Sequence, residues 1–195
     1  MLPGVQPAPF PSLPVLAEAL GSIPAPELEG ARIEAAVLVC LNDDAVLLAR
    51  RAVHPDDPWS GHAALPGGRW EAGDPSLLAT ALRETQEELG FDPLEHGSLL
   101  GALGTQMGRG RRIDGVRIAV FVAALDERPA IALSDELESA HWVPLSALVP
   151  VAARVPELPD TDVSAYAVEL RDGGPLVVWG ITYAILERLR ALSDV

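Results

Sequence analysis

The chain has 195 residues, a length typical of one domain, and 49% of them are hydrophobic, enough to bury a substantial core. Its 28 acidic residues against 14 lysines and arginines give a net charge of −14, which disfavours nucleic acids and anionic membranes because such partners need basic patches. The single cysteine, Cys40, excludes an internal disulfide and lies in an apolar run, which indicates a buried residue rather than a nucleophile.

The first thirty residues are rich in proline and are expected to form an extended arm, residues 1–30, with one short helix between Ser12 and Gly21. The arm lacks the basic start of a signal peptide, and no uninterrupted apolar run approaches the ~18 residues of a membrane helix. We therefore expect a soluble cytoplasmic protein. The arm is expected to pack on its own domain or on a second subunit, an arrangement compatible with a homodimer.

Residues 31–195 are expected to form the main domain, which opens with two strands. Arg32–Leu41 and Ala45–Arg51 are β-branched and apolar and flank a short polar turn. A long loop follows over Ala52–Ala64, and Pro66-Gly67-Gly68 is expected to break the chain sharply.

A helix is predicted from about Pro75 to Leu89, with Asp74 as its N-cap and Gly90 as its stop. Strands, a hairpin and a closing amphipathic helix are predicted after it. The strands are Leu99–Leu103, Val116–Leu125 and Glu138–Val143, the hairpin joins Val163–Leu170 to Pro175–Trp179, and the helix is Thr182–Leu192. This mixture predicts an α+β fold with helices packed on hairpin-paired strands.

Three acidic residues of the first predicted helix share one face, because Glu84, Glu87 and Glu88 stand at i, i+3 and i+4. Such carboxylates repel one another, and a hard divalent cation such as Mg²⁺ offsets that repulsion with oxygen ligands. Arg83 can reach Glu87 at i+4. An acidic helix alone is more often a solvated face, but a glycine turn leads into this one, which favours a metal or phosphate site. The opposite, apolar face can bury against a sheet and consists of Leu78, Ala81, Leu82, Thr85 and Leu89.

The acidic helix lies within a longer spaced motif. Gly68 is followed by five residues to Gly73, then Asp74, then eight residues, then Arg83-Glu84-Thr85-Gln86-Glu87-Glu88-Leu89-Gly90-Phe91. This pattern resembles the Nudix box, which usually has glutamate where Asp74 stands and one residue fewer before the arginine. The resemblance extends over residues 32–150 and implies the Nudix-type α/β/α sandwich with a mixed β-sheet.

The resemblance also implies a reaction, in which water activated by Mg²⁺ or Mn²⁺ attacks a phosphorus of a diphosphate. Glu84, Glu87 and Glu88 would be metal ligands, with the Gly67 carbonyl as a further candidate, and Arg83 would orient them. Glu136 resembles a later-loop glutamate that assists in this family, although an exposed loop charge is an equal interpretation. The proton acceptor would be Glu88, Glu87 or Glu136.

A second set of residues resembles the coenzyme A pyrophosphatase branch of the family, which splits coenzyme A or its derivatives into 3′,5′-ADP and a 4′-phosphopantetheine product. The set comprises Leu47-Leu48-Ala49-Arg50-Arg51-Ala52, Gly61, Pro66-Gly67-Gly68 and Trp179-Gly180-Ile181-Thr182. The chain departs from the branch at Asp56, where a second arginine is usual, and at Leu65, where an aromatic residue is usual. The loop before Gly61 is also one residue longer.

Several further residues are candidates for contact with the substrate. The Gly67-Gly68 pair lets backbone approach a phosphate closely, so Gly68 is a candidate. The arginine candidates for phosphate are Arg50, Arg51, Arg69, Arg109, Arg111 and Arg112, with Arg51 supported by the motif. His54, His62 and Trp59 are interpreted as loop packing or substrate contacts, and Trp179 as an anchor for the last helix.

Two other functions stay open. The chain could be a broader hydrolase of dinucleotides, nucleotide sugars or nucleoside triphosphates, or a non-catalytic ligand sensor on the same fold. All three box glutamates are present and no helix-turn-helix is evident, so we expect an enzyme whose partner is a small nucleotide-like molecule.

Overall fold

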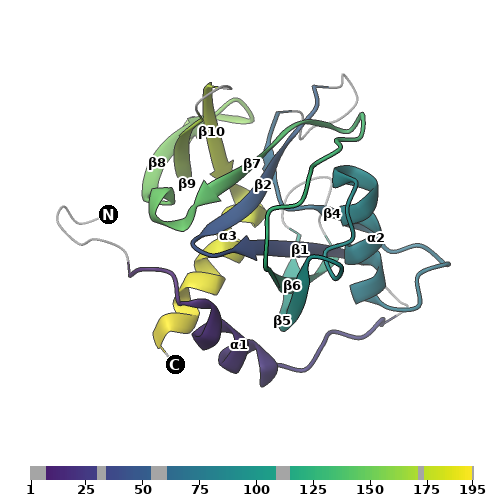
Figure 1. The fold of residues 1–195 in the computed structure, drawn as a ribbon. Helices are drawn as coiled ribbons and strands as arrows, with labels where there is room; N and C mark the ends of the chain where they lie inside the picture. The colour runs from purple at the N-terminus through teal and green to yellow at the C-terminus, as the bar shows by residue number, and fades with distance from the viewer. Residues whose placement is uncertain (1–7, 30–33, 54–60, 109–114, 171–173, 195) are drawn as a thin grey trace.

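The structure is a computed structural model and describes residues 8–29, 34–53, 61–108, 115–170 and 174–194. Its centre is a seven-stranded sheet in the order β3-β2-β1-β6-β5, with β4 paired to β1 and β7 paired to β2 (Figure 1). The central strands are β1 (Glu34–Asn42), β2 (Ala45–Arg51), β3 (Ala63–Ala64), β4 (Gly67–Arg69), β5 (Gly97–Met107), β6 (Arg117–Leu125) and β7 (Leu137–Pro144). Strands β1 and β6 are parallel and the other pairs antiparallel, so the sheet is mixed, as predicted.

Helices cover both faces of this sheet. Helix α2 (Leu77–Leu89) packs on one face, and α1 (Leu13–Gly21) and α3 (Gly180–Arg190) pack on the other (Figure 1). Alternate residues of β1 serve the two layers, because Leu38 belongs to the α2 core and Val39 to the α1 and α3 core. The predicted α/β/α sandwich is thereby confirmed.

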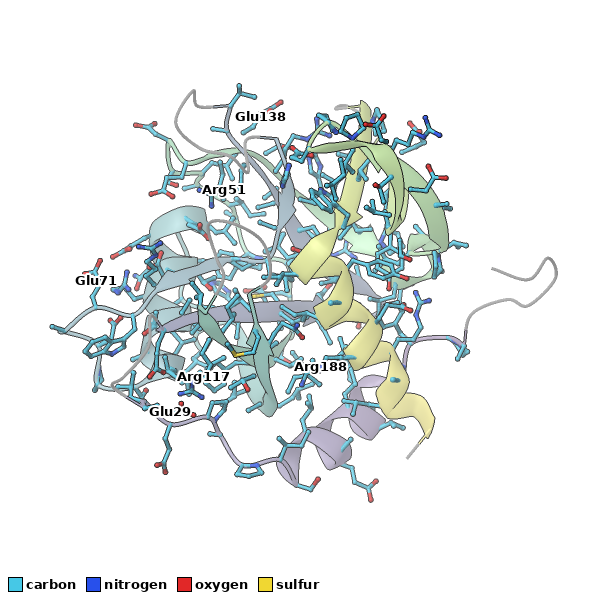
Figure 2. All side chains as sticks on the ribbon, turned by 180° about the vertical axis from the view of Figure 1, so that it is seen from behind. Glu29, Arg51, Glu71, Arg117, Glu138 and Arg188 are labelled. Carbon is cyan, nitrogen blue, oxygen red and sulfur yellow. The ribbon has the colours of Figure 1, made fainter. Side chains whose placement is uncertain are left out.

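The proline-rich arm carries the predicted helix, and α1 packs into the main core rather than standing apart. Leu16 and Leu20 are fully buried, and each contributes about 1.5–3 kcal/mol of burial free energy. After α1, the chain is tied to the sheet by Arg117, whose guanidinium lies 2.8 Å from the Glu34 carboxylate and 3.6 Å from that of Glu29 (Figure 2).

A second sheet of three antiparallel strands lies beside the central one, in the order β10-β9-β8 (Figure 1). Its strands are β8 (Pro150–Val155), β9 (Leu158–Leu170) and β10 (Gly174–Trp179), and short 3₁₀ turns occur at Leu145–Ala147 (η1) and Ala191–Asp194 (η2). The predicted hairpin of β9 and β10 is confirmed. No described helix is both long and apolar enough to cross a membrane.

Two local predictions around the glycine turn are wrong. Pro66-Gly67-Gly68 does not simply break the chain, because residues 67–69 form β4 and pair with β1. A side chain at Gly67 would come within 2.3 Å of the Ala36 carbonyl oxygen, so only glycine allows this approach. The N-cap of α2 is Ser76, whose hydroxyl accepts the Ala79 amide at 3.1 Å, and not Asp74. The helix stop at Gly90 is confirmed, with φ of 79°.

Candidate active site

Arg83, in the middle of the acidic helix, connects two of its glutamates to Asp74 and to β4. Its guanidinium binds both carboxylate oxygens of Asp74, each at 2.9 Å, and so forms a bidentate ion pair. The same group donates to Glu84 at 3.1 Å, to Glu87 at 2.9 Å and to the Arg69 carbonyl at 3.2 Å. The predicted contact with Glu87 is therefore present, and Arg83 also joins α2 to the end of β4.

Asp74 is the buried anchor of this network. Its carboxylate also accepts the Thr80 hydroxyl at 2.9 Å and the Glu71 amide at 3.1 Å. Hydrogen bonding from Arg83 is the main cause that lowers the pKa of Asp74 to about 2, against the opposing effect of burial. Asp74 is thus a permanent anion that fixes Arg83, a role that its place before the helix did not reveal.

Glu88 and Glu84 face the glycine turn from the inner side of α2. Glu88 is only 6% exposed and accepts the Gly67 amide at 3.0 Å. Burial raises the pKa of Glu88 to about 7, and burial also raises the pKa of Glu84. A side chain at Gly68 would come within 2.4 Å of the Glu84 carboxylate, so the glycine leaves the room that this carboxylate occupies.

These carboxylates line an acidic pocket of about 400 Å³ between α2, β4 and the end of β2. It is lined by Arg51, Gly67, Gly68, Arg69, Glu84, Glu88 and Glu136. Glu136 lies at its rim, with a side chain 68% exposed and a carboxylate 3.9 Å from the Arg51 guanidinium. At that exposure the ion pair is weak, and the Glu136 carboxylate stays accessible.

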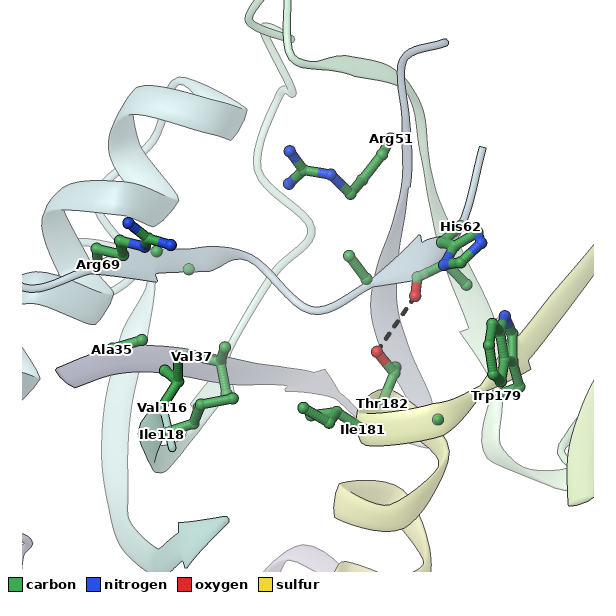
Figure 3. Close-up of a pocket in the computed structure, with 15 residues that line it drawn as sticks. Ala35, Val37, Arg51, His62, Arg69, Val116, Ile118, Trp179, Ile181 and Thr182 are labelled. Atoms are coloured by element: carbon green, nitrogen blue, oxygen red, sulfur yellow. Dashed lines mark hydrogen bonds between the residues drawn. The ribbon is translucent and has the colours of Figure 1, made fainter. Parts of the chain in front are cut away.

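An apolar cavity of about 330 Å³ adjoins the acidic pocket (Figure 3). The two share Arg51, Gly67, Gly68 and Arg69, so the arginines stand at the boundary between an acidic and an apolar space. The rest of the cavity is lined by Ala35, Val37, His62, Ala63, Ala64, Val116, Ile118, Trp179, Gly180, Ile181 and Thr182. The arrangement provides room for a charged group beside a mainly apolar one.

The structure brings together most of the residues singled out in the sequence, but not all. Arg50 donates to the Pro175 carbonyl at 2.9 Å in the second sheet and is absent from the described lining of either space. Glu87 is 59% exposed, pairs with Arg83 and lies outside the described lining of the acidic pocket. The remaining candidates lie outside the described residues: His54, Trp59, Arg109, Arg111 and Arg112.

The apolar cavity was not predicted from the sequence. Trp179 was expected to anchor the last helix, and it does precede α3, but it also lines the cavity. The motif Trp179-Gly180-Ile181-Thr182 was the available signal. Its distance in sequence from the acidic helix concealed that the two border adjoining spaces.

Comparison with known proteins gives a consistent picture. Residues 31–162, more than half of the chain, match the NUDIX domain family. An uncharacterized protein of Schizosaccharomyces pombe is 39% identical over 108 residues, which are 53% of this chain and 33% of that protein. The match thus spans about a third of the yeast relative. The uncharacterized Nudix hydrolase NudL of Salmonella newport is 29% identical over 145 residues, 74% of this chain and 72% of that protein.

Solved structures share the fold at lower identity. The crystal structure of a C. elegans Ap4A hydrolase binary complex aligns with a TM-score of 0.56 at 17% identity, over 83% of this chain and 98% of that chain. A MutT/nudix family protein from Enterococcus faecalis aligns with a TM-score of 0.54 at 20% identity, over 94% of this chain and 70% of that chain. These likenesses concern the fold alone.

Proposed function

The chain belongs to the NUDIX domain family, the Nudix hydrolases, and we propose that it hydrolyses the diphosphate bond of coenzyme A or a coenzyme A derivative. Nudix hydrolases are pyrophosphohydrolases that act on nucleoside diphosphates linked to another group, and they generally need a divalent metal ion. The proposal adds the substrate, the residues that hold it and the residues that hold the metal.

The observation that carries the substrate proposal is the lining of the two adjoining spaces. Arg51 and Trp179 belong to sequence elements that resemble the coenzyme A branch, and they border the same apolar cavity although 128 positions separate them in the numbering. Coenzyme A joins a charged diphosphate to an uncharged pantetheine arm, and the site offers an acidic, metal-binding space beside an apolar one.

The donor set fits a hard divalent cation such as Mg²⁺ or Mn²⁺. Among the described residues no three acidic, histidine or cysteine side chains form a ready metal cluster, since Glu87 is turned toward Arg83. Glu84 and Glu88 nevertheless place two carboxylates in the acidic pocket, and burial raises the pKa of both, so their ionised forms would gain from compensating positive charge. A bound cation would supply that compensation and would lower the pKa of a water molecule.

The Gly67 carbonyl would supply a third oxygen ligand. Backbone hydrogen bonds between β1 and β4 join Leu38 to Pro66 and Trp70 to Glu34. Because bonded and non-bonded positions alternate along an antiparallel pair, the Gly67 backbone turns away from β1, and its amide donates to Glu88. In this proposal Glu84, Glu88 and the Gly67 carbonyl hold the metal, and Glu87 holds Arg83 or joins the ligand set by changing rotamer.

The other residues of the acidic pocket have separate roles. Arg51 and Arg69 would bind phosphate oxygens, because they are the arginines that line it and their guanidinium groups can donate two hydrogen bonds at once. Glu136 would accept the proton of the attacking water, since its carboxylate is exposed at the rim and is not needed as a ligand. The Gly68 backbone would lie against the substrate, since Gly68 lines both the acidic pocket and the apolar cavity.

Product analysis tests this function. Purified protein with Mg²⁺ or Mn²⁺ should convert coenzyme A to 3′,5′-ADP and 4′-phosphopantetheine, and Glu84→Gln and Glu88→Gln should lower turnover by orders of magnitude while the fold is retained. Glu136→Gln should lower kcat and leave metal affinity unchanged, whereas a loss of metal affinity would make Glu136 a ligand instead.

A broader substrate range is the second candidate, and Asp56 is the observation that favours it. An acidic residue stands where the coenzyme A branch usually has an arginine, which removes one cation available to the 3′-phosphate. Release of AMP from NADH at a rate above that of coenzyme A cleavage would establish this alternative.

A further inference from the structure

Residues beyond the matched family region complete the apolar cavity. The match ends at residue 162, whereas Trp179, Ile181 and Thr182 form one wall of the cavity. Trp179 is the last residue of β10, and Ile181 and Thr182 lie in the first turn of α3, so the junction between the second sheet and α3 forms this wall (Figure 3). The part of the chain outside the family match therefore shapes the space beside the acidic pocket.

The His62 ring contacts Trp179, and a separate hydrogen bond fixes the start of α3 that follows it. The His62 ring meets the indole in an edge arrangement, with centroids 5.2 Å apart and planes at 64°. His62 is itself bonded through Nε2 to the Glu157 carboxylate at 2.6 Å, and Glu157 lies in the connection between β8 and β9. At the start of α3, the Thr182 hydroxyl donates to the Ala63 carbonyl at 3.2 Å and joins α3 to β3 (Figure 3).

The interior of the cavity suits an uncharged group. Val37, Ile118, Ile181 and Trp179 supply apolar surface, and the arginines stand where the cavity meets the acidic pocket. Of the two arms of coenzyme A, the nucleoside arm carries a 3′-phosphate, and moving that charge into an apolar cavity would be costly. The pantetheine arm carries no charge.

We propose that Trp179 contacts the uncharged arm of the substrate and selects it, and that His62 and Glu157 act as positioning residues for the indole. The inference rests on the proposed function, because it takes the diphosphate to lie in the acidic pocket. It assigns specificity to the second sheet and to the start of α3, and catalysis to α2 and β4.

The test compares two substrates that share an ADP group and differ only in the other arm, dephospho-coenzyme A and ADP-ribose. Trp179→Ala should lower kcat/KM for dephospho-coenzyme A about tenfold, as expected for a lost aromatic contact, and change that for ADP-ribose little. Trp179→Phe should keep part of the selectivity. Trp142→Phe is the matched control, because Trp142 packs in the α2 core away from the cavity. It should leave kcat/KM unchanged for both substrates.

The positioning residues have a readout that general destabilisation would not give. Glu157→Ala should raise KM for dephospho-coenzyme A and leave kcat unchanged, and Glu157→Gln should restore KM because its amide oxygen still accepts a hydrogen bond from His62. An unchanged KM in Glu157→Ala would remove Glu157 and His62 from the proposal.

Two results would overturn the assignment of Trp179. Equal losses on both substrates would place the shared adenosine in the cavity, and no loss on either would exclude the contact. A binding measurement distinguishes failure of this inference from failure of the proposed function. It uses Ca²⁺ and a variant in which Trp179 is the only tryptophan (Trp59→Phe, Trp70→Phe and Trp142→Phe), so that the fluorescence reports on Trp179. Quenching of its fluorescence by dephospho-coenzyme A but not by ADP-ribose supports the inference even without turnover, and the absence of quenching contradicts it.

Discussion

Replacing Asp74 by Asn should destabilise the protein by an amount that depends on pH. Asp74 is 8% exposed and holds Arg83 through two hydrogen bonds of 2.9 Å. The ion pair lowers its pKa from 3.8 to about 2. At 1.36 kcal/mol per pKa unit, this difference corresponds to about 2 kcal/mol of stability at neutral pH.

The pH dependence of this stability follows from the direction of the Asp74 pKa shift. Because the pKa of Asp74 is lower in the folded protein, its contribution is complete above the unfolded value near 3.8 and is lost as pH falls toward 2. Urea unfolding at pH 7 should show Asp74→Asn less stable than the wild type by about 2 kcal/mol, with the gap narrowing sharply by pH 3.

Asp162→Asn is the matched control. Asp162 also pairs with an arginine at 3.0 Å, but its side chain is 60% exposed and that of Arg154 is 72% exposed. Such surface pairs contribute about 0–1 kcal/mol. The reasoning about burial would be refuted if the two variants lost similar stability, or if the Asp74→Asn gap did not depend on pH.

Two further predictions concern the acidic pocket. Gly68→Ala should lower metal affinity and turnover at least about tenfold, because its methyl group would displace the Glu84 carboxylate 2.4 Å away. Gly73→Ala has open space around it and should change neither quantity. Calorimetric titration with Mn²⁺ and turnover assays check this, and equal effects of the two variants would contradict it. Arg51→Ala should raise KM for the diphosphate substrate about tenfold or more. Arg50→Ala should leave KM near the wild-type value, because the Arg50 guanidinium binds the Pro175 carbonyl. Steady-state kinetics measure both KM values, and a larger increase in Arg50→Ala than in Arg51→Ala would exchange their roles.

Much of the central domain could be predicted because its signals are local. The i, i+3 and i+4 spacing of Glu84, Glu87 and Glu88 needs only a helix, and Gly90 ends that helix in the left-handed conformation, as expected. The apolar runs of β1 and β6 are long enough to indicate buried strands, and their parallel pairing accounts for burial on both faces.

The errors lie where tertiary contacts override local preference. Strand β8 escaped prediction because proline stands at its first residue and directly after its last, a pattern that usually marks loops. Residues 67–69 look like a turn, yet the close approach to β1 makes them a strand. Asp74 is a residue type that often caps helices, but its carboxylate forms an ion pair with Arg83, nine residues later.

The apolar cavity could not be predicted at all from local patterns. Trp179 and His62 come from distant segments, and only the packing of the second sheet against β3 brings their rings within 5.2 Å. The sequence identified the chemistry of the acidic helix, while the space beside it is a property of the assembled fold.

Glu84 and Glu88 form a carboxylate pair that is proposed to need a divalent cation, and thermal unfolding at pH 8 tests this requirement most directly. Magnesium or manganese at 100 times its Kd should stabilise the wild type by about 2.7 kcal/mol, or roughly 5–10 °C in Tm. Glu88→Gln should unfold at a higher temperature than the metal-free wild type, because a buried anion has been removed, and should gain little from either metal. A wild type that does not respond to magnesium or manganese, or a Glu88→Gln variant that responds equally, would contradict the metal site.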